Sequence, residues 1–470
     1  MFNLAFFALF AGVIAAAYLY LFRSKQKKKK SLPPSPVGFP VIGHLHLLKE
    51  PVHRCLRDLS RNLGPVFSLR PVSALGEYVG YNNTVISAAP YGEHWRNLRR
   101  ICTVEIFSAA RPRDSVEIRR DEVRALLRKI HVATSGGDAV GLQLRPLLSA
   151  LTFNVVMRMV AGKRYYGDEN DENKEVRELI REAFALGGIT YVGDFLPIVS
   201  LLDLGGYVER GKKLGSKLDK FLQKLVDERL RNRGKTEAEN SMITHLLSLQ
   251  ESEPEYYTDE IIKGLVLVML LAGTDTTAVT LEWAMSILLN HPEVLKKVKT
   301  ELTDVVVSSE GRLMEERDVD KCAYLNNVIA ETLRLYPAAP LLVPHASSDN
   351  CEVAGYDIPR GSWLVINAWA IQRDPKVWDE PDAFKPERFE SETHRGKFIP
   401  FGIGRRACPG MGLAQLVLSL SLGSLIQCFD WERDDAVAVD MSKGKGLTMP
   451  KAVPLVAKCK SSPILHKVVL

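Results

Sequence analysis

Apolar positions are most concentrated between Thr258 and Pro292, where the pattern predicts one long helix. Thr258 is a good N-cap residue, and Asp259 and Glu260 follow it, where negative charge favours the positive end of the helix dipole. Residues 261–272 are almost unbroken apolar sequence, which is typical of a helix buried on all sides. We therefore expect this helix, about 48 Å long, to cross the centre of the folded domain.

A lysine and a polar segment distinguish this stretch from a membrane span. Lys263 interrupts it and residues 274–277 are all polar, so we interpret the helix as a core element. A second apolar helix is expected over residues 413–428, and strand-type stretches lie around residues 355–368 and 447–457. Because helix-type sequence dominates, the pattern predicts a mostly α fold with small β-sheets.

The first 30 residues show an apolar run followed by a basic one. Residues 2–22 contain Asn3 as their only strongly polar residue, and a helix of that length reaches about 30 Å, enough to span a bilayer. A cleaved signal peptide is the alternative, because the alanines at 15–17 resemble a cleavage site. No base precedes the run, so we favour an uncleaved single-pass anchor over residues 1–22, with the body in the cytosol. The bases that follow the run are Arg23, Lys25, Lys27, Lys28, Lys29 and Lys30.

Residues 23–43 join this anchor to the body. The basic run is typical of a stop-transfer signal, and residues 31–43 include four prolines, which favour an extended, semi-rigid hinge. An ordinary Pro-rich linker is the alternative interpretation of the same composition. The remainder, residues 44–470, is expected to form the functional domain.

Composition and charge exclude several classes of protein. The chain has 470 residues, 46% hydrophobic and 25% charged, which indicates a folded protein with a sizeable core. Subtracting the six bases of residues 1–30 from 62 leaves 56 bases against 56 acids, so the body lacks the basic excess of a nucleic-acid-binding protein. The seven cysteines are scattered and form no CxxC pair, which argues against a disulfide framework or a zinc site.

The strongest chemical signal is the segment 401–410, in which glycines flank Cys408 just before the predicted helix over 413–428. Glycines let a backbone approach a flat partner closely, and N–H groups at the start of a helix stabilise a thiolate. Gly402-x-Gly404-x-x-Ala407 also fits a loose dinucleotide fingerprint. We do not favour that alternative, because no βαβ alternation follows and few residues remain.

Three further groups of residues carry candidate chemistry. In the central helix, Asp275 and Thr276 provide an acid beside an alcohol, a pair that can pass protons, although such residues in mid-helix often bond only to the preceding turn. Trp95 and Arg99 lie one helical turn apart and can reach one carboxylate. Glu331 and Arg334, three residues apart, are by themselves a common surface pair, and Arg388 lies downstream of them.

Together these motifs resemble the cytochrome P450 family of haem-thiolate monooxygenases. The Phe-x-x-Gly-x-Arg-x-Cys-x-Gly pattern from Phe401 to Gly410 resembles the family's haem-binding loop, and the Glu-x-x-Arg and Pro-Glu-Arg-Phe motifs follow its order. The resemblance implies the cytochrome P450 fold with an N-terminal transmembrane helix, and haem b (iron protoporphyrin IX) as cofactor. Cys408 would be the axial ligand of the iron, where a thiolate favours O–O cleavage.

The resemblance also assigns roles to the other residues. The catalytic pair would be Thr276 as the proton-passing alcohol and Asp275 as the acid. The residues expected at the haem are Phe401, which would shield the sulfur, Gly402 in the loop, and Trp95, Arg99, His345 and Arg406, which would hold the propionates. The structural cluster would be Glu331, Arg334 and Arg388.

Electrons must come from another protein, because no flavin or nicotinamide site is credible in this chain. The resemblance implies a membrane-bound NADPH-cytochrome P450 reductase, with cytochrome b5 as a second candidate donor, at the endoplasmic reticulum membrane. Membrane lipid, O2 and a small hydrophobic aromatic substrate complete the expected partners, and nucleic acid is excluded.

Several motifs across the chain look most like plant microsomal members close to the isoflavone hydroxylases. We therefore expect insertion of one oxygen atom from O2 into a small aromatic plant metabolite, isoflavonoid-like or flavonoid-like, without assigning the substrate or the position oxidised. The positions expected to face substrate are Tyr81, Leu271, Ala272, Ala338, Leu341 and Met449.

One segment departs from the family pattern. Between Arg70 and Tyr78 stand seven residues, where the family places two strands and a helix that need about 25 residues. The sequence therefore predicts a shortened first sheet, and either a natural variant or a faulty gene model. A catalytically impaired haem-binding remnant is the alternative function. A third reading, a haem-thiolate isomerase or dehydratase, is disfavoured by the pair Asp275 and Thr276.

Overall fold

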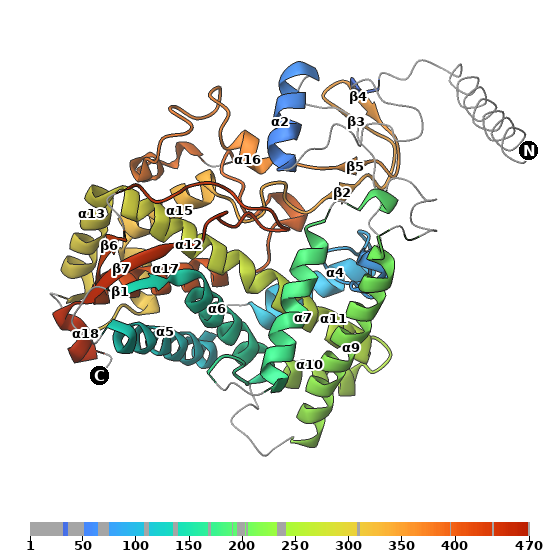
Figure 1. Ribbon diagram of the computed structural model, residues 1–470. Coiled ribbons are helices and arrows are strands. Elements are labelled where there is room, and N and C mark those ends of the chain that lie inside the picture. Colours follow the sequence, from blue (N-terminus) through green and yellow to red (C-terminus); the bar gives the residue numbers. More distant parts are fainter. Residues whose placement is uncertain are drawn as a thin grey trace, which may run out of the picture. The chain divides into compact units, whose positions relative to one another are not determined.

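The computed structural model in Figure 1 describes residues 32–35, 51–63, 75–107, 112–134, 140–167, 171–189, 191–194, 203, 205–232, 241–307, 311–394, 396–434 and 437–468. By contacts the chain divides into two compact units. The first comprises residues 1–72, 192–202 and 344–364, and the second comprises residues 73–191, 203–343 and 365–470.

The first unit contains short elements. Two antiparallel pairs of strands form here, β2 with β5 and β3 with β4. Its described elements are α2 (Val52–Leu63), the 3-10 turn η4 (Val192–Asp194), β2 (His345–Ala346), β3 (Cys351–Val353), β4 (Tyr356–Ile358) and β5 (Trp363–Leu364). The strands β4 and β5 confirm the strand-type sequence expected around residues 355–368.

The second unit is dominated by helices, which confirms the mostly α fold. Its described α-helices are α3 (Leu75–Tyr78), α4 (Glu93–Arg100), α5 (Pro112–Thr134), α6 (Leu144–Ala161), α7 (Asp171–Gly187), α9 (Tyr207–Arg231), α10 (Met242–Ser252), α11 (Asp259–Gly273), α12 (Asp275–Asn290), α13 (Pro292–Leu302), α15 (Ala323–Leu335), α16 (Ala368–Ile371), α17 (Met411–Cys428) and α18 (Pro463–Val468). Shorter 3-10 and π segments are η3 (Ile101–Ile106), η6 (Thr303–Val307), η7 (Glu316–Lys321), η8 (Pro386–Glu390), η9 (Glu392–His394) and η10 (Gly404–Arg406).

One antiparallel sheet belongs to the second unit, with the strand order β1-β7-β6. Its strands are β1 (Val140–Gln143), β6 (Phe429–Arg433) and β7 (Val456–Ser461). The strand expected over residues 447–457 begins only at Val456, because residues 447–455 mostly form turns and irregular structure. The sequence pattern did not predict β1 and β6, which are short.

The long central helix has the predicted ends but is divided in two. Thr258 caps α11, and its hydroxyl accepts a hydrogen bond from the Ile261 N–H. Pro292 does not only end the helix, as expected, but is the first residue of α13. Between α11 and α12 the backbone of Thr274 interrupts the helix. The predicted burial is correct for both halves, because most residues of α11 and nearly all of α12 are buried.

Two hydrophobic clusters fill the second unit (Figure 1). One lies where α12 packs on α6, α15 and α17, and the other surrounds α11, α9, α7 and α10. Among the described residues, three helices are long and apolar enough to cross a membrane: Leu144–Ala161, the combined Asp259–Asn290, and Met411–Cys428. Two thirds of each is buried inside the protein, so their apolar sequence is explained by packing.

Three predictions fall mostly or wholly outside the described residues. They are the transmembrane anchor over residues 1–22, the hinge over residues 23–43, of which only 32–35 are described, and the shortened segment between Arg70 and Tyr78, of which residues 71–74 are not described.

Candidate functional site

The loop that carries Cys408 is held by backbone hydrogen bonds. The Cys408 N–H donates to the Phe401 carbonyl at 2.9 Å, and the Ala407 N–H donates to the Gly404 carbonyl at 3.1 Å. Gly402 and Gly404 have φ angles of +71° and +77°, which favour glycine over any other residue. The fold of this loop therefore explains its glycine pattern, and α17 begins directly after it.

Cys408 is the exposed cysteine of the second unit. Cys102, Cys322, Cys428 and Cys459 are buried there, whereas Cys408 is exposed. Although the residue is exposed, neighbouring atoms partly desolvate its thiol and raise its pKa, while a hydrogen bond from the Gly410 backbone and the positive charge of Arg99 act in the opposite direction. An accessible sulfur with a backbone donor and a nearby cation is the arrangement that an anionic thiolate ligand requires.

Two arginines meet at this loop. The Arg99 guanidinium, from α4, donates to the Ala407 carbonyl, and the Arg406 guanidinium donates to the Ala89 carbonyl at 2.9 Å. Arg406 also lies over the ring of Trp95, 4.8 Å from its centroid. Trp95 is buried and its indole N–H donates to the Ile86 carbonyl at 3.2 Å. The structure therefore brings Trp95, Arg99 and Arg406 together beside the Cys408 loop.

These residues fit a haem. An accessible cysteine sulfur can ligate iron, and two guanidinium groups beside it can pair with carboxylates. His345 lies in β2 of the first unit, half-buried. Its expected contact with a propionate stays a prediction.

The polar segment at the break between α11 and α12 is internally hydrogen-bonded. The Thr276 hydroxyl donates to the Ala272 carbonyl at 2.6 Å, and the Thr277 and Thr280 hydroxyls donate to carbonyls one turn earlier. These are the bonds to the preceding turn that mid-helix threonines often make. Ala272 is exposed, and Leu271 and Gly273 beside it are half-buried, so this segment borders open space.

Both oxygens of the Asp275 carboxylate have partners. Arg145, at the start of α6, forms an ion pair with one oxygen, and the Thr448 hydroxyl donates to the other at 2.5 Å. Arg145 also reaches Glu282 at 3.5 Å, and Glu282 accepts from the Leu455 N–H at 3.0 Å. A proton relay through Asp275 therefore requires one of these contacts to open.

The residues expected to face substrate do not all lie in one part of the second unit. Ala338 and Met449 meet, because the Met449 N–H donates to the Ala338 carbonyl at 2.9 Å, and both residues are buried. The Trp283 indole N–H holds the Met449 carbonyl at 2.8 Å. Leu341 is half-buried in the loop after α15.

Tyr81 and Leu271 belong to the α11 side of the unit. Tyr81 donates its hydroxyl to Asp219 at 2.9 Å, and Lys263 donates to the same oxygen at 2.7 Å. Burial of the ring and the hydrogen bond to Asp219 raise the pKa of the Tyr81 hydroxyl above its ordinary value. Leu271 is half-buried, one residue before the exposed Ala272.

The predicted structural cluster is buried and fully paired. Arg334 donates to both oxygens of Glu331 at 2.6 and 2.8 Å, and Arg388 donates to one of them at 2.9 Å. Arg334 also donates to the carbonyls of Gln372 and Pro381 at 2.7 Å. Glu331 and Arg334 are completely buried, so this cluster fastens α15 to the loops that follow α16.

Sequence reasoning missed Arg145, Thr448, Trp283 and Asp219. Thr448 directly precedes Met449, so the neighbourhood of a predicted substrate position was a signal for it. For Arg145 and Asp219 the sequence holds no motif, because their partners lie on other helices.

Comparisons with known proteins agree with these observations. The family model described as Cytochrome P450 matches residues 70–456. Cytochrome P450 81Q32 of Catharanthus roseus is 51% identical, covering 98% of this chain and 97% of that protein. Isoflavone 3'-hydroxylase of Medicago truncatula is 44% identical over 95% of this chain and 96% of that protein. Isoflavone 2'-hydroxylase of Glycyrrhiza echinata is 45% identical over 100% of this chain and 97% of that protein.

Solved structures show the same fold. A zebra fish cytochrome P450 with abiraterone aligns with a TM-score of 0.73 and 22% identity, covering 88% of this chain and 100% of that chain. A zebra fish cytochrome P450 with progesterone gives a TM-score of 0.74.

Proposed function

The chain belongs to the cytochrome P450 family and is a monooxygenase that uses haem, and from this premise we propose that it oxidises a small aromatic plant metabolite of the isoflavonoid or flavonoid kind. The observation that carries the proposal is the Cys408 loop, which presents an accessible sulfur between a backbone donor and Arg99. Haem b, when bound, supplies the activation of dioxygen and the one-electron chemistry.

The residues around that loop are proposed to position the haem. Cys408 would ligate the iron, Phe401 and Gly402 would shape the loop, and Arg99, Arg406, Trp95 and His345 would hold the propionates. The half-buried ring of Phe401 packs against the hydrophobic core and restricts water near the sulfur.

Thr276 and Asp275 are proposed to deliver protons. The Thr276 hydroxyl donates a hydrogen bond to the Ala272 carbonyl, so the hydroxyl oxygen is available as an acceptor beside the exposed Ala272. Asp275 is held by Arg145 and Thr448, and it takes up and passes a proton when the Thr448 contact opens.

The substrate class rests on relatives and on the buried wall of the site. Two relatives are named isoflavone 2'-hydroxylase and isoflavone 3'-hydroxylase, whereas another is named (+)-piperitol/(+)-sesamin synthase. Ala338 and Met449 are buried apolar residues joined by a backbone hydrogen bond, and we propose that they form a wall for a flat aromatic ring, completed by Leu341, Leu271, Ala272 and Tyr81.

Electrons are proposed to come from NADPH through a membrane-bound reductase, with cytochrome b5 as a second donor. The apolar run of residues 2–22 and the six bases after it support a single-pass anchor in the endoplasmic reticulum membrane, with the body in the cytosol.

The carbon monoxide difference spectrum of the reduced protein in microsomes tests the proposal first. A thiolate-type Soret band should appear, vanish in Cys408→Ala and persist in Cys351→Ala, a matched control at another exposed cysteine. Incubation with a plant reductase, NADPH and a panel of isoflavones should then give hydroxylated products. A band without any product from aromatic substrates would contradict the substrate class.

A second candidate, an impaired haem-binding remnant, is favoured by a gap in the alignments. The alignment with the Glycyrrhiza echinata protein spans 502 positions, 32 more than this chain has residues. We infer that part of them falls in the short segment between Arg70 and Tyr78. A missing band, or only the band of a displaced thiolate, would support the remnant over the active enzyme.

A further inference from the structure

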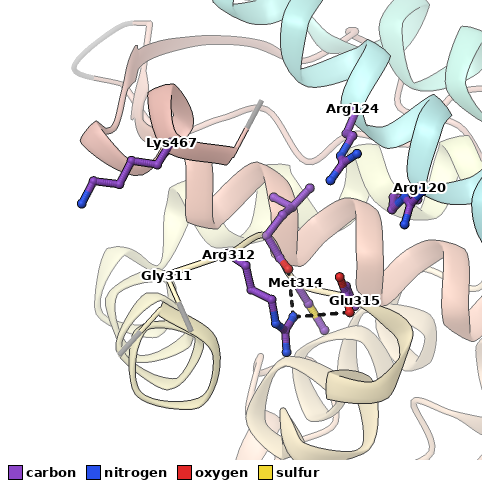
Figure 2. A pocket seen from close by; sticks show the side chains of 8 residues that line it. Arg120, Arg124, Gly311, Arg312, Met314, Glu315 and Lys467 are labelled. Carbon is purple, nitrogen blue, oxygen red and sulfur yellow. Dashed lines mark hydrogen bonds and ion pairs between the residues drawn. The ribbon is translucent and has the colours of Figure 1, made fainter. Parts of the chain in front are cut away.

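A small pocket lies in the second unit, between α5, the loop before η7 and α18 (Figure 2). Its volume is about 210 Å³. Figure 2 shows Arg120 and Arg124 projecting from α5 on the side of the loop that carries Arg312 and Glu315, with Lys467 on α18. The lining residues are Arg120, Arg124, Gly311, Arg312, Leu313, Met314, Glu315 and Lys467.

The charges of the loop side are already paired. Arg312 donates to both oxygens of Asp318 at 2.6 and 2.9 Å. Glu315, the one carboxylate of the lining, lies 3.9 Å from Arg312 and 3.0 Å from Arg317. Its negative charge is therefore shared between two guanidinium groups and does not neutralise the cations across the pocket.

The charges of the α5 side are in excess. Arg120 pairs with Glu117 on its own helix. Among the described residues Arg124 and Lys467 have no ion-pair partner. The pocket is thus bordered by cations whose countercharge must come from outside the described chain.

Hydrogen bonding on α5 is also incomplete. Arg119 Nη2, Arg120 Nε and Arg124 Nε are buried and have no hydrogen-bond partner within the described residues. A buried donor without an acceptor is costly, and more so when it is charged. Of these three residues, Arg120 and Arg124 line the pocket, and Arg119 does not.

The loop side of the pocket is rigidly supported. Gln427, in the last turn of α17, donates to the Arg312 carbonyl at 2.6 Å and accepts from the Met314 N–H at 3.0 Å. Leu313 and Met314 are buried against the core. Because the loop is held on both sides of Leu313, the geometry of the pocket is preformed.

We propose that this pocket binds a phosphate group, with Arg120 and Arg124 donating to its oxygens and Lys467 adding charge at the rim. A tetrahedral dianion offers its oxygens to the guanidinium groups that line the pocket and supplies the negative charge that the lining lacks. The volume is below the 300–1,000 Å³ or so of sites for drug-sized ligands, so it suits inorganic phosphate or a phosphate headgroup rather than an aromatic substrate.

The test uses the full-length holoenzyme in phosphatidylcholine nanodiscs. Inorganic phosphate is titrated at constant ionic strength against chloride while Tm is measured. A saturable rise in Tm is expected with phosphate and not with chloride, because ligands that bind the native state stabilise it by mass action. An equal response to chloride would overturn the proposal, since it would show general screening.

Variants locate the effect. Arg124→Gln should weaken phosphate binding at least tenfold, and Lys467→Gln, at an exposed position that does not affect folding, should weaken it severalfold. Arg128→Gln removes the same charge from an exposed position of α5 outside the pocket and should leave binding unchanged. Unchanged binding in both Arg124→Gln and Lys467→Gln would overturn the site.

The source of the phosphate is distinguished by the lipid. In nanodiscs that contain phosphatidic acid, loss of the response to added phosphate would identify a lipid headgroup as the occupant. A retained response, together with competition by glycerol 3-phosphate, would identify a soluble phosphate. The carbon monoxide spectrum in the same samples should stay unchanged, which separates this site from the proposed oxidation chemistry.

Discussion

Two groups of arginines in the second unit differ in one respect. In the Glu331 cluster, the Nε and both Nη atoms of Arg334 and of Arg388 all donate hydrogen bonds. On α5, three buried guanidinium nitrogens of Arg119, Arg120 and Arg124 have no partner within the described residues. Each group contains a fully buried arginine, Arg334 in one and Arg119 in the other, so burial alone does not distinguish a structural arginine from one that binds a ligand. The two kinds of arginine differ in whether their guanidinium N–H groups all have hydrogen-bond acceptors within the protein.

The origin of the acceptors explains the difference. Around Arg334, the acceptors are Glu331 and carbonyls of residues 372–383, which the chain itself supplies. Each α5 arginine has at most one carboxylate partner. Arg119 pairs with Glu316, and Arg120 pairs with Glu117. The first group therefore stabilises the fold, and we propose that the second binds a phosphate group.

The largest expected effect is the loss of stability when Arg334 is removed from the fully hydrogen-bonded Glu331 cluster. Arg334→Gln leaves Glu331 with Arg388 as its only described cation and removes the donors to the Gln372 and Pro381 carbonyls. Breaking a buried pair in this way costs about 3–5 kcal/mol. Urea unfolding should show that loss, or the variant should fail to accumulate.

Arg128→Gln is the control, because exposed substitutions stay within about 0.5 kcal/mol. A loss below about 1 kcal/mol in Arg334→Gln would remove the basis of the comparison.

An intermediate and pH-dependent effect is expected at Asp318, which anchors the loop side of the phosphate pocket. Burial acts to raise the pKa of this carboxyl, but hydrogen bonds from Arg312 and from the Glu315 backbone outweigh it, so the pKa lies below the ordinary 3.8. The stabilisation is therefore present above pH 3.8 and is lost as the pH falls through the lower pKa of the folded state.

Asp318→Asn should lose about 1.5–3 kcal/mol at pH 7, as expected for hydrogen bonds to a charged group. The difference from the wild type should shrink as the urea midpoint is measured at pH values below 3.8. Asp320→Asn, at an exposed neighbouring position, should show no such dependence. A difference that stays constant with pH would contradict the assignment.

A smaller effect is expected at Thr448. Thr448→Val removes the hydroxyl that donates to Asp275 at the helix break and costs about 1 kcal/mol. Because Met449 follows, we expect the ratio of oxidised products to change more than the carbon monoxide band. Thr303→Val, which removes an exposed bond to the Lys299 carbonyl, is the control and should leave the products unchanged. Identical product ratios in all three proteins would place Thr448 outside the site.

The smallest effect is expected at Arg124, and it tests most directly whether the α5 arginines differ from Arg334. In phosphate-free buffer, Arg124→Gln removes a half-buried charge whose Nε has no partner among the described residues, so stability should stay the same or rise by up to about 1 kcal/mol. The same substitution type at Arg334 is strongly destabilising, so only the change at Arg334 should lower stability. A destabilisation of Arg124→Gln comparable to that of Arg334→Gln would show that Arg124 is structural.

Much of this fold could be predicted because the relevant signals are local. The N-cap at Thr258 and the proline at 292 mark the ends of the central helix, and Gly402 and Gly404 of the Cys408 loop have the positive φ angles that favour glycine. The helix over residues 413–428 was expected from its apolar sequence, and α17 begins only two residues earlier.

The remainder depends on tertiary contacts that no local pattern encodes. The break at Thr274 lies where Gly273 packs against Val156 of α6, so closely that a Cβ at Gly273 would stand 3.0 Å from the valine side chain. The partners of Asp275 come from residues 145 and 448, which the sequence does not connect. Strands β1 and β6 were missed because each is short and is defined by its pairing with β7.

The break at Thr274 has a consequence for how such a protein changes over generations. On one side, α11 is fastened to α9 through Lys263 and Asp219, and on the other, α12 is embedded among α6, α15 and α17. A substitution that tilts α11 need not be transmitted through continuous helix into α12. Substitutions in α11 can therefore accumulate during evolution without displacing Asp275 and Thr276 at the start of α12, so the proposed substrate wall and the proposed proton-delivering pair can change separately.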